Sequence, residues 1–229
     1  AGACDKVIDK AKLIAAHQLE CSADDLEFAG GIFSVKGSPD RAVPIAALAF
    51  AAFTAHNLPD GLEPNLEAQY TYDPPNFSWP FGTHMAIVEI DVETGKIEVL
   101  KYVAVDDCGV QINPLIVEGQ VHGGVIQGLA QALFEEAVYD EDGNLKTTTL
   151  AEYLVPAACD VPSITTAHTV TPSPTNQLGV KGIGEAGTIG AAPTIINAII
   201  DALSSLGVKH MPMPASPQTV WRAIQSAKK

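Results

Sequence analysis

One segment constrains the fold more than any other: a run of small residues that leads into the most apolar stretch of the chain. Residues 179–187 read GVKGIGEAG and hold a single carboxylate, Glu185. Residues 189–206 follow with a strongly apolar helical pattern that stops at Gly207. A helix that is apolar on most sides has to be buried. We therefore expect this helix in the core, entered through a glycine-rich loop that spans residues 171–190.

Elsewhere, helical and strand patterns interleave without a regular alternation. We expect helices at 5–19, 45–55, 115–134 and 218–227, and strands at 26–28, 32–35, 84–92, 96–105 and 164–170. The clearest hairpin joins 84–92 to 96–105 across the turn Glu93-Thr94-Gly95. Residues 57–80 are rich in Pro and Asn and predict a long ordered loop. The interleaving predicts the α+β class, and 229 residues suit one large domain or two small ones.

The predicted helix 115–134 is unusual because it retains four glycines, Gly119, Gly123, Gly124 and Gly128. Each glycine costs a helix about 1 kcal/mol relative to alanine. Keeping four of them indicates close approach by a second backbone or by a ligand, and the sequence leaves both open. Gln120 and Gln127 lie seven residues apart, on one face. Neutral amides suit the orientation of a polar cofactor, although capping or interhelical hydrogen bonds also explain them.

Glu185 has two physical interpretations. The apolar helix should exclude water from one side of the carboxylate, which is the environment of a tuned general base. Alternatively, Glu185 is a solvated loop residue stabilised by a helix N-terminus, and the residues alone favour this second interpretation. A phosphate loop is excluded because no Gly-Lys-Ser or Gly-Lys-Thr triplet is present. A dinucleotide fingerprint is excluded because residues 171–178 are a Pro-rich loop and not a strand.

Charge and residue spacing remove several other classes of function. Lys and Arg number 13 against 27 Asp and Glu, and the formal charge of −14 disfavours nucleic acid and anionic membranes. No two of the four cysteines have CxxC spacing, and His84, His122, His168 and His210 lie far apart, so we expect no metal ligated by this chain. We also expect no apolar run long enough to span a membrane, since Asn197 and Asp201 interrupt 195–206. With no signal peptide pattern, a cytoplasmic location is expected.

Three ordered segments carry a resemblance to a known family. They are DDCGVQINP (106–114), GQVHGGVIQG (119–128) and GVKGIGEAGTIGAAP (179–193). Together they resemble the xanthine oxidase and carbon monoxide dehydrogenase family, in detail the bacterial carbon monoxide dehydrogenase-like large subunits. The resemblance covers essentially the whole chain and is clearest over 81–224. It implies that residues 1–229 are the C-terminal part of the molybdenum-cofactor-binding domain of such a large subunit.

The resemblance also implies an activity and partners. Members of this family are molybdenum hydroxylases, in which molybdopterin, often as the cytosine dinucleotide, holds the metal through its dithiolene. They oxidise a carbon centre of a small-molecule substrate with oxygen derived from water. Electrons leave through [2Fe–2S] clusters to FAD. The implied partners are the remainder of the large subunit, an FAD-binding medium subunit and an iron–sulfur small subunit.

Four positions match the family's site motifs. Glu185 falls on the active-site glutamate of the GxGE pattern, whose role would be to deprotonate the hydroxyl on molybdenum or, in some members, to orient substrate. Gln120 falls on the glutamine of the G-Q-x-x-G-G helix, which approaches the cofactor. Gly119 and Gly184 would shape the backbone beside it. A desolvated carboxylate is a stronger base, which agrees with the first interpretation of Glu185.

The chain also departs from the family. The large subunit of that family is several times longer than this chain. In the family, the substrate-side loop and the first pterin-contacting segments lie N-terminal to the part that this chain resembles. The start of the chain lacks an initiator Met, so we expect either a fragment or a large subunit split over separate chains. Carbon monoxide, aldehydes, N-heterocycles and alkaloids all remain as substrates. A non-catalytic assembly remnant is the alternative, although Glu185 and Gln120 together favour an enzyme.

Overall fold

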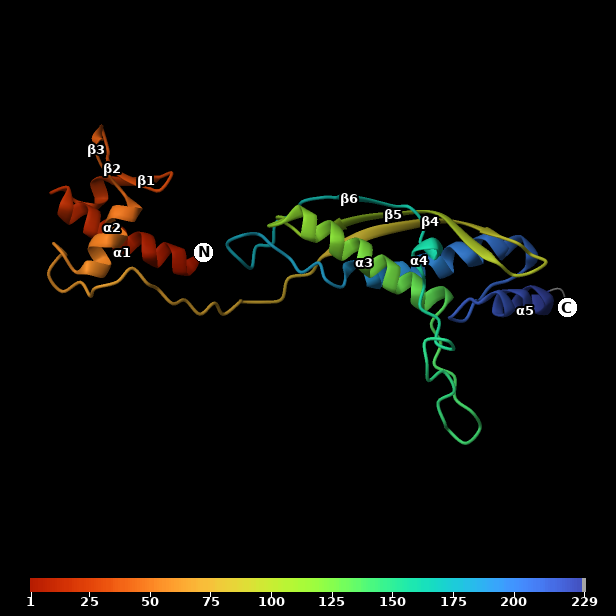
Figure 1. Cartoon of the computed structure of the whole chain (residues 1–229). Coiled ribbons are helices and arrows are strands. Elements are labelled where there is room, and N and C mark those ends of the chain that lie inside the picture. Colours follow the sequence, from red (N-terminus) through yellow and green to blue (C-terminus); the bar gives the residue numbers. More distant parts are fainter. Residues whose placement is uncertain (228–229) are drawn as a thin grey trace. The chain divides into compact units, whose positions relative to one another are not determined.

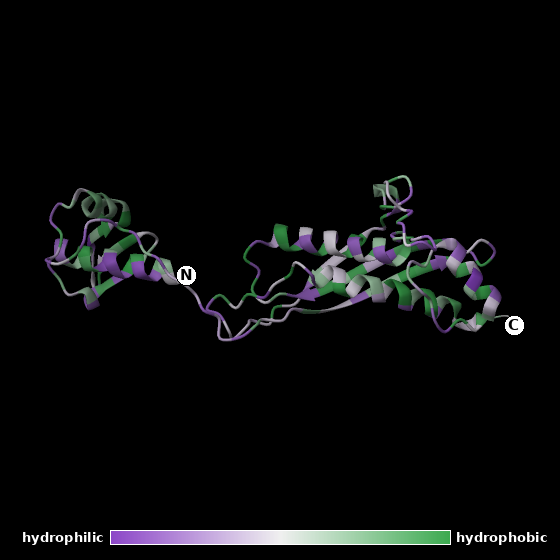
Figure 2. Cartoon of the chain, turned by 90° about the horizontal axis from the view of Figure 1, so that it is seen from below, coloured by the Kyte–Doolittle hydropathy of each residue, from purple (hydrophilic) through white to green (hydrophobic). Residues whose placement is uncertain are grey.

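The computed structural model describes residues 1–227 as two compact units, residues 1–74 and residue 75 onward. Each unit has a hydrophobic core of its own. Hydrophobic residues run along the helices of both units (Figure 2). The mixture of helices with small sheets confirms the predicted α+β class.

The first unit packs two helices against a small antiparallel sheet. Its elements are α1 (Gly2–Gln18), η1 (Ala23–Asp25), β1 (Leu26–Ala29), β2 (Ile32–Val35), β3 (Ser38–Pro44) and α2 (Ile45–Thr54), with strand order β1-β2-β3. Ile14 from α1, Phe33 from β2 and Leu48 from α2 are fully buried in its core. β3 was not among the strands predicted from the sequence. It is an edge strand in which six of seven residues are exposed, so it shows no apolar alternation.

The second unit places two long helices on the same side of a three-stranded sheet (Figure 1). Its elements are β4 (Phe81–Ile90), β5 (Ile97–Asp107), α3 (Pro114–Leu133), η2 (Ala158–Asp160), β6 (Ile164–His168), α4 (Ala186–Leu203), η3 (Ser204–Leu206) and α5 (Pro217–Ala227). β5 pairs antiparallel with β4 and parallel with β6. Val125, Ile195 and Ile199 are fully buried between the helices and the sheet.

Helix α4 begins three residues earlier than the apolar pattern predicted, at Ala186. The glycine-rich run therefore extends into the first turn of the helix. With η3, residues Ala186–Leu206 are long and apolar enough to cross a membrane by length and composition alone, which corrects the expectation that no such segment exists. In the second unit this helix is a core element, because Ala191, Ile195 and Ile199 have no exposed surface.

The glycines of α3 divide into two kinds. A Cβ atom built on Gly124 would lie 2.8 Å from the backbone nitrogen of Thr188, and one built on Gly128 would lie 2.6 Å from the Cβ of Ala191. Close packing of α4 therefore requires these two glycines. A Cβ on Gly119 or Gly123 would meet no atom within 4 Å among the described residues. Helix packing thus explains one pair and leaves the backbone of the other pair bare.

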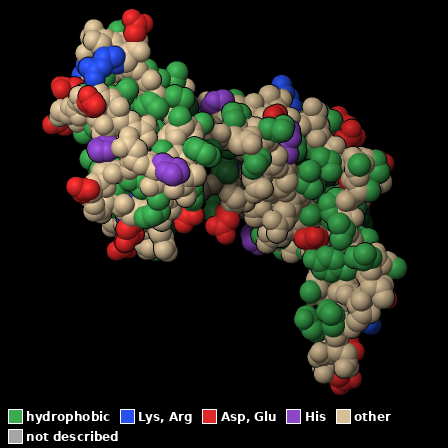
Figure 3. Space-filling view, turned by 60° about the vertical axis from the view of Figure 1, so that its left-hand side comes forward, with side chains coloured by type: hydrophobic (Ala, Val, Ile, Leu, Met, Phe, Trp, Pro, Cys, Tyr) green, Lys and Arg blue, Asp and Glu red, His purple; other side chains and the backbone are tan. Residues whose placement is uncertain are grey.

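Between α3 and β6 the chain makes a long excursion, residues 134–163, away from the helices (Figure 1). It is tied together by the bridge Tyr139↔Leu145 and by the turn at Asp140, whose carboxylate accepts the backbone N–H of Asn144 at 2.8 Å. Hydrophobic side chains gather along it (Figure 3), and Leu150 is 80% exposed. An exposed apolar surface of this kind is typical of a segment that contacts other protein.

Candidate functional site

The two glycine-rich motifs meet in the second unit. A Cβ atom built on Gly184 would lie 3.6 Å from Oε1 of Gln120 on α3. Glu185 follows Gly184 directly and is the N-cap residue of α4. The fold therefore brings Gln120, Gly184 and Glu185 together from segments far apart in the chain.

Glu185 is exposed in the part of the chain that the structure describes. Its carbonyl oxygen accepts the N–H of Ile189 at 3.0 Å, which ties it to the first turn of α4. The expectation that the apolar helix shields this carboxylate from water is wrong for these residues. The buried side of α4 faces α3 and the sheet, whereas Ile189, one turn after Glu185, is 71% exposed.

The two glutamines of α3 have different surroundings. Oγ1 of Thr188 lies 2.9 Å from the carbonyl oxygen of Gly124 and 3.1 Å from Oε1 of Gln127, so Gln127 joins α3 to α4. The amide of Gln120 is exposed and makes no side-chain hydrogen bond within residues 1–227. Beside it lies the bare backbone of Gly119 and Gly123. A flat, polar group fits this surface, since neither glycine carries a side chain, the space beside both is open, and a neutral amide is available to orient the group.

The Asp-Asp-Cys-Gly motif at the end of β5 anchors the loop that carries Glu185. The carboxylate of Asp107 is fully buried and accepts hydrogen bonds from the N–H of Gly109 (2.9 Å), Nζ of Lys181 (3.0 Å) and Oγ1 of Thr169 (2.8 Å). Burial raises the pKa of Asp107, but these donors together hold it well below its ordinary value. Asp107 is therefore a buried anion with donors on both oxygens.

Backbone pairing reinforces this anchor. The N–H of Val110 donates to the carbonyl of Gly179 at 3.0 Å, and the N–H of Lys181 donates to the carbonyl of Cys108 at 2.8 Å. Gly109 has φ +68°, and a Cβ there would clash with the carbonyl oxygen of Gly179. Only glycine allows this close approach. Neither Asp107 nor Lys181 was among the functional residues predicted from the sequence, although the two consecutive aspartates that end β5 were an available signal.

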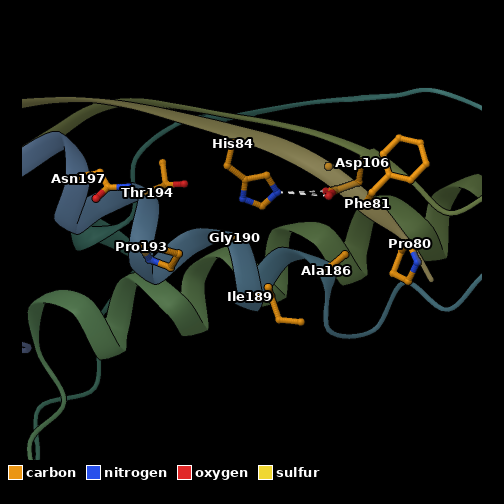
Figure 4. A pocket seen from close by; sticks show the side chains of 11 residues that line it. Pro80, Phe81, His84, Asp106, Ala186, Ile189, Gly190, Pro193, Thr194 and Asn197 are labelled. Carbon is orange, nitrogen blue, oxygen red and sulfur yellow. Dashed lines mark hydrogen bonds and ion pairs between the residues drawn. The ribbon is translucent and has the colours of Figure 1, made fainter.

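A second buried network lies beside α4, also missed from sequence. Nδ1 of His84 lies 2.8 Å from the hydroxyl of Tyr102, and Nε2 lies 3.3 Å from Oδ1 of Asp106. The His84 and Asp106 side chains are only 3% and 5% exposed. Both line a pocket with a volume of about 330 Å³, which runs along α4 from Ala186 to Asn197 (Figure 4). The pocket thus starts one residue after Glu185.

Tyr102 gives this network a testable pH dependence. Burial raises its pKa to about 12 from the ordinary 10, and Asp106 adds to the shift. The folded state therefore keeps the phenol proton at a pH where the unfolded chain has lost it. This contribution to stability is complete below pH 10 and is lost as the pH rises towards 12. The unfolding temperature of the full-length protein should fall as the pH is raised from 9, and it should fall less in Tyr102→Phe. An equal fall in the wild type and the variant would contradict the raised pKa of Tyr102.

No group of three or more His, Cys, Asp or Glu side chains is placed to hold a metal ion within residues 1–227. The histidines singled out from the sequence do not gather at the site. Of these, His84 belongs to the buried network. The site described above therefore consists of a carboxylate, a neutral amide and bare helix backbone.

Known proteins place the chain in a family. Residues 1–162 match the family model described as the molybdopterin cofactor-binding domain. The carbon monoxide dehydrogenase large chain of Hydrogenophaga pseudoflava is 43% identical over 97% of this chain and 28% of its own length. The nicotine 6-hydroxylase large subunit of Paenarthrobacter nicotinovorans is 42% identical over 93% of this chain and 26% of its own length.

Solved structures agree. Carbon monoxide dehydrogenase from Oligotropha carboxidovorans superposes with a TM-score of 0.95 and 40% identity, covering 99% of this chain and 28% of that chain. The chain therefore spans less than a third of the length of the relatives it matches. Since the family model covers more than half of the chain and these alignments extend it through Glu185, the chain belongs to the molybdopterin cofactor-binding domain family, in the group of carbon monoxide dehydrogenase and xanthine dehydrogenase large subunits.

Proposed function

We propose that this chain is the C-terminal part of the molybdopterin-binding domain in the large subunit of a molybdenum hydroxylase. The assembled enzyme oxidises a carbon centre with oxygen derived from water, and Glu185 acts as the base. The observation that carries the proposal is the position of Gly184 beside Oε1 of Gln120, which puts Glu185 next to the bare face of α3. A base, an orienting amide and an uncovered backbone are the parts that such a site needs.

Each residue has a physical role in this proposal. When bound, the molybdenum–molybdopterin cofactor, proposed here in its cytosine dinucleotide form, supplies the two-electron redox chemistry. Gln120 orients it through a neutral amide, and Gly119 leaves room for its approach. Gly184 keeps the backbone next to Gln120 free of a side chain. Glu185 accepts the proton from the water-derived nucleophile as the new bond to carbon forms.

The remainder of the enzyme is also part of the proposal. Other parts of the large subunit, an FAD-binding medium subunit and an iron–sulfur small subunit carrying [2Fe–2S] clusters would complete the site and remove electrons. The exposed apolar excursion at 134–163 supports contact with such partners. The four cysteines are free, which suits the reducing cytoplasm. A small organic molecule or carbon monoxide is the proposed class of substrate.

A non-catalytic assembly domain of the same fold is the second candidate. Metal analysis of the full-length large subunit, purified with the chains that accompany it, distinguishes the two candidate functions. We expect about one molybdenum and one pterin per large subunit. A stable complex that contains neither would favour the assembly domain and reject the proposed function.

Gln120→Ala tests the orienting amide. Alanine is a better helix former than glutamine, and Gln120 is exposed, so the fold should be unaffected. Loss of one hydrogen bond worth about 1 kcal/mol should lower cofactor occupancy or turnover about fivefold. Gln131→Ala, an exposed glutamine of the same helix, is the matched control. Molybdenum content and turnover equal to those of the control would make Gln120 a surface residue without a role at the site.

A further inference from the structure

We propose that Lys181 is a positioning residue: its buried ion pair with Asp107 fixes the loop before α4 and so sets the place of the Glu185 carboxylate. This inference rests on the proposed function of Glu185 as the base. Lys181 lies four residues before Glu185 and does not itself act on substrate. Its effect is transmitted through the backbone of residues 182–184.

The ion pair is unusually well enclosed. The side chain of Lys181 is 8% exposed and that of Asp107 is not exposed at all, with Nζ 3.0 Å from Oδ1. Nζ also lies 4.6 Å from the centroid of the Phe81 ring, which holds the ammonium from a second direction. Three elements therefore meet at this one ammonium: the end of β5, the start of β4 and the loop.

The loop has two fixed points, and Glu185 lies between them. On one side, the N–H and the ammonium of Lys181 are both bonded to the end of β5. On the other side, Gly187 is pressed against α3, where a Cβ on it would lie 2.7 Å from the carbonyl oxygen of Val121. A Cβ on Gly182 would meet no described atom within 4 Å, so this residue does not restrain the backbone. Ile183 packs against the core, and its carbonyl accepts the N–H of Ala186 at 3.2 Å. The backbone bond of Lys181 also remains when its side chain is changed. Loss of the ammonium should therefore loosen the loop before Glu185 and shift it, without releasing it.

A role in stability alone is a weaker explanation. Replacing a buried ion pair by apolar residues of similar size is often neutral or stabilising, so such a pair is poor evidence for stability. An ion pair with a hydrogen bond fixes the geometry of its two groups, which an apolar contact does not do. Here that geometry fixes the loop that carries the proposed base.

The test uses the full-length large subunit in its assembled, cofactor-loaded complex. Lys181→Met should lower kcat about 10²-fold, the cost of a displacement near 1 Å at a reacting group. KM and molybdenum content should hardly change. Lys101→Met, an exposed lysine on β5, is the matched control and should behave as wild type. In a Glu185→Gln background, Lys181→Met should have no further effect on kcat, because the group that it positions is already gone.

Two results would overturn the inference. One is a kcat for Lys181→Met within twofold of the control. The other is a loss in the Glu185→Gln background as large as in wild type, which shows that Lys181 acts independently of Glu185. If Lys181→Met does not fold, the double variant Asp107→Asn/Lys181→Met, which removes both charges, takes its place and its kcat is compared with that of the control. A low kcat is expected, and a wild-type kcat would contradict the inference. Near-normal turnover of Glu185→Gln alone would instead reject the proposed function.

Discussion

Glu185→Gln is expected to lower turnover of the assembled enzyme by about 10²–10⁴-fold while molybdenum stays bound. Glutamine keeps the shape of the side chain and its hydrogen bonding, but it cannot accept a proton as a carboxylate does. The stability of the fold should not change, because Glu185 is exposed and no buried volume is lost. The measurement is the rate at which substrate reduces the enzyme under single-turnover conditions, with molybdenum quantified in the wild type and in Glu185→Gln.

Glu136→Gln is the control for this substitution. Glu136 is an exposed glutamate shortly after α3, so its variant carries the same chemical change away from the site. Both variants should unfold at the temperature of the wild type. If Glu185→Gln retained full cofactor and was reduced by substrate as fast as Glu136→Gln, Glu185 would have no part in the proton transfer.

Much of the fold follows from local patterns. The helices at Pro114–Leu133 and Pro217–Ala227 and the hairpin of β4 and β5 were predicted to within a few residues, because apolar periodicity and turn residues are local signals. β3 lacked any such signal, since it is an exposed edge strand. The start of α4 was misplaced because Ala186 and Gly187 resemble loop residues. Their helical conformation is stabilised by the contact of Gly187 with α3, which is a tertiary contact.

The site was predictable where motifs are contiguous and unpredictable where they are not. The resemblance placed Gln120 and Glu185 at one site, and the fold brings their segments together. The ion pair between Asp107 and Lys181 joins residues 74 positions apart, so no pattern within either segment predicts that the two side chains meet. From the sequence, Tyr102 is likewise an ordinary strand residue, and only the fold shows the hydrogen bond between its hydroxyl and His84. Such pairs depend on the register of β4 on β5 and on the path of the loop, which no local pattern encodes.

Two leucine substitutions in α3 should have opposite consequences. Gly119→Leu adds a side chain where the described residues leave open space, and it replaces glycine by a good helix former, so the fold should be stabilised by about 1 kcal/mol. The same side chain would cover the bare backbone next to Gln120. The full-length protein should therefore fold and assemble but lose most of its molybdenum. Unfolding temperature and metal content, measured on the same preparation, test both halves of this expectation.

Gly124→Leu places the identical side chain further along α3, in the contact with α4. Even a Cβ there would be 2.8 Å from the backbone nitrogen of Thr188 and 3.0 Å from the Cα of Gly187, and backbone atoms cannot give way as a flexible side chain can. Overpacking of this kind costs about 1–3 kcal/mol or more. The unfolding temperature should therefore fall whether or not the cofactor is bound. Full molybdenum in Gly119→Leu would show that the cofactor does not approach this face of α3. Unchanged stability in Gly124→Leu would show that α4 can move away, and then the position of Glu185 at its N-cap would not be fixed by the packing of the two helices.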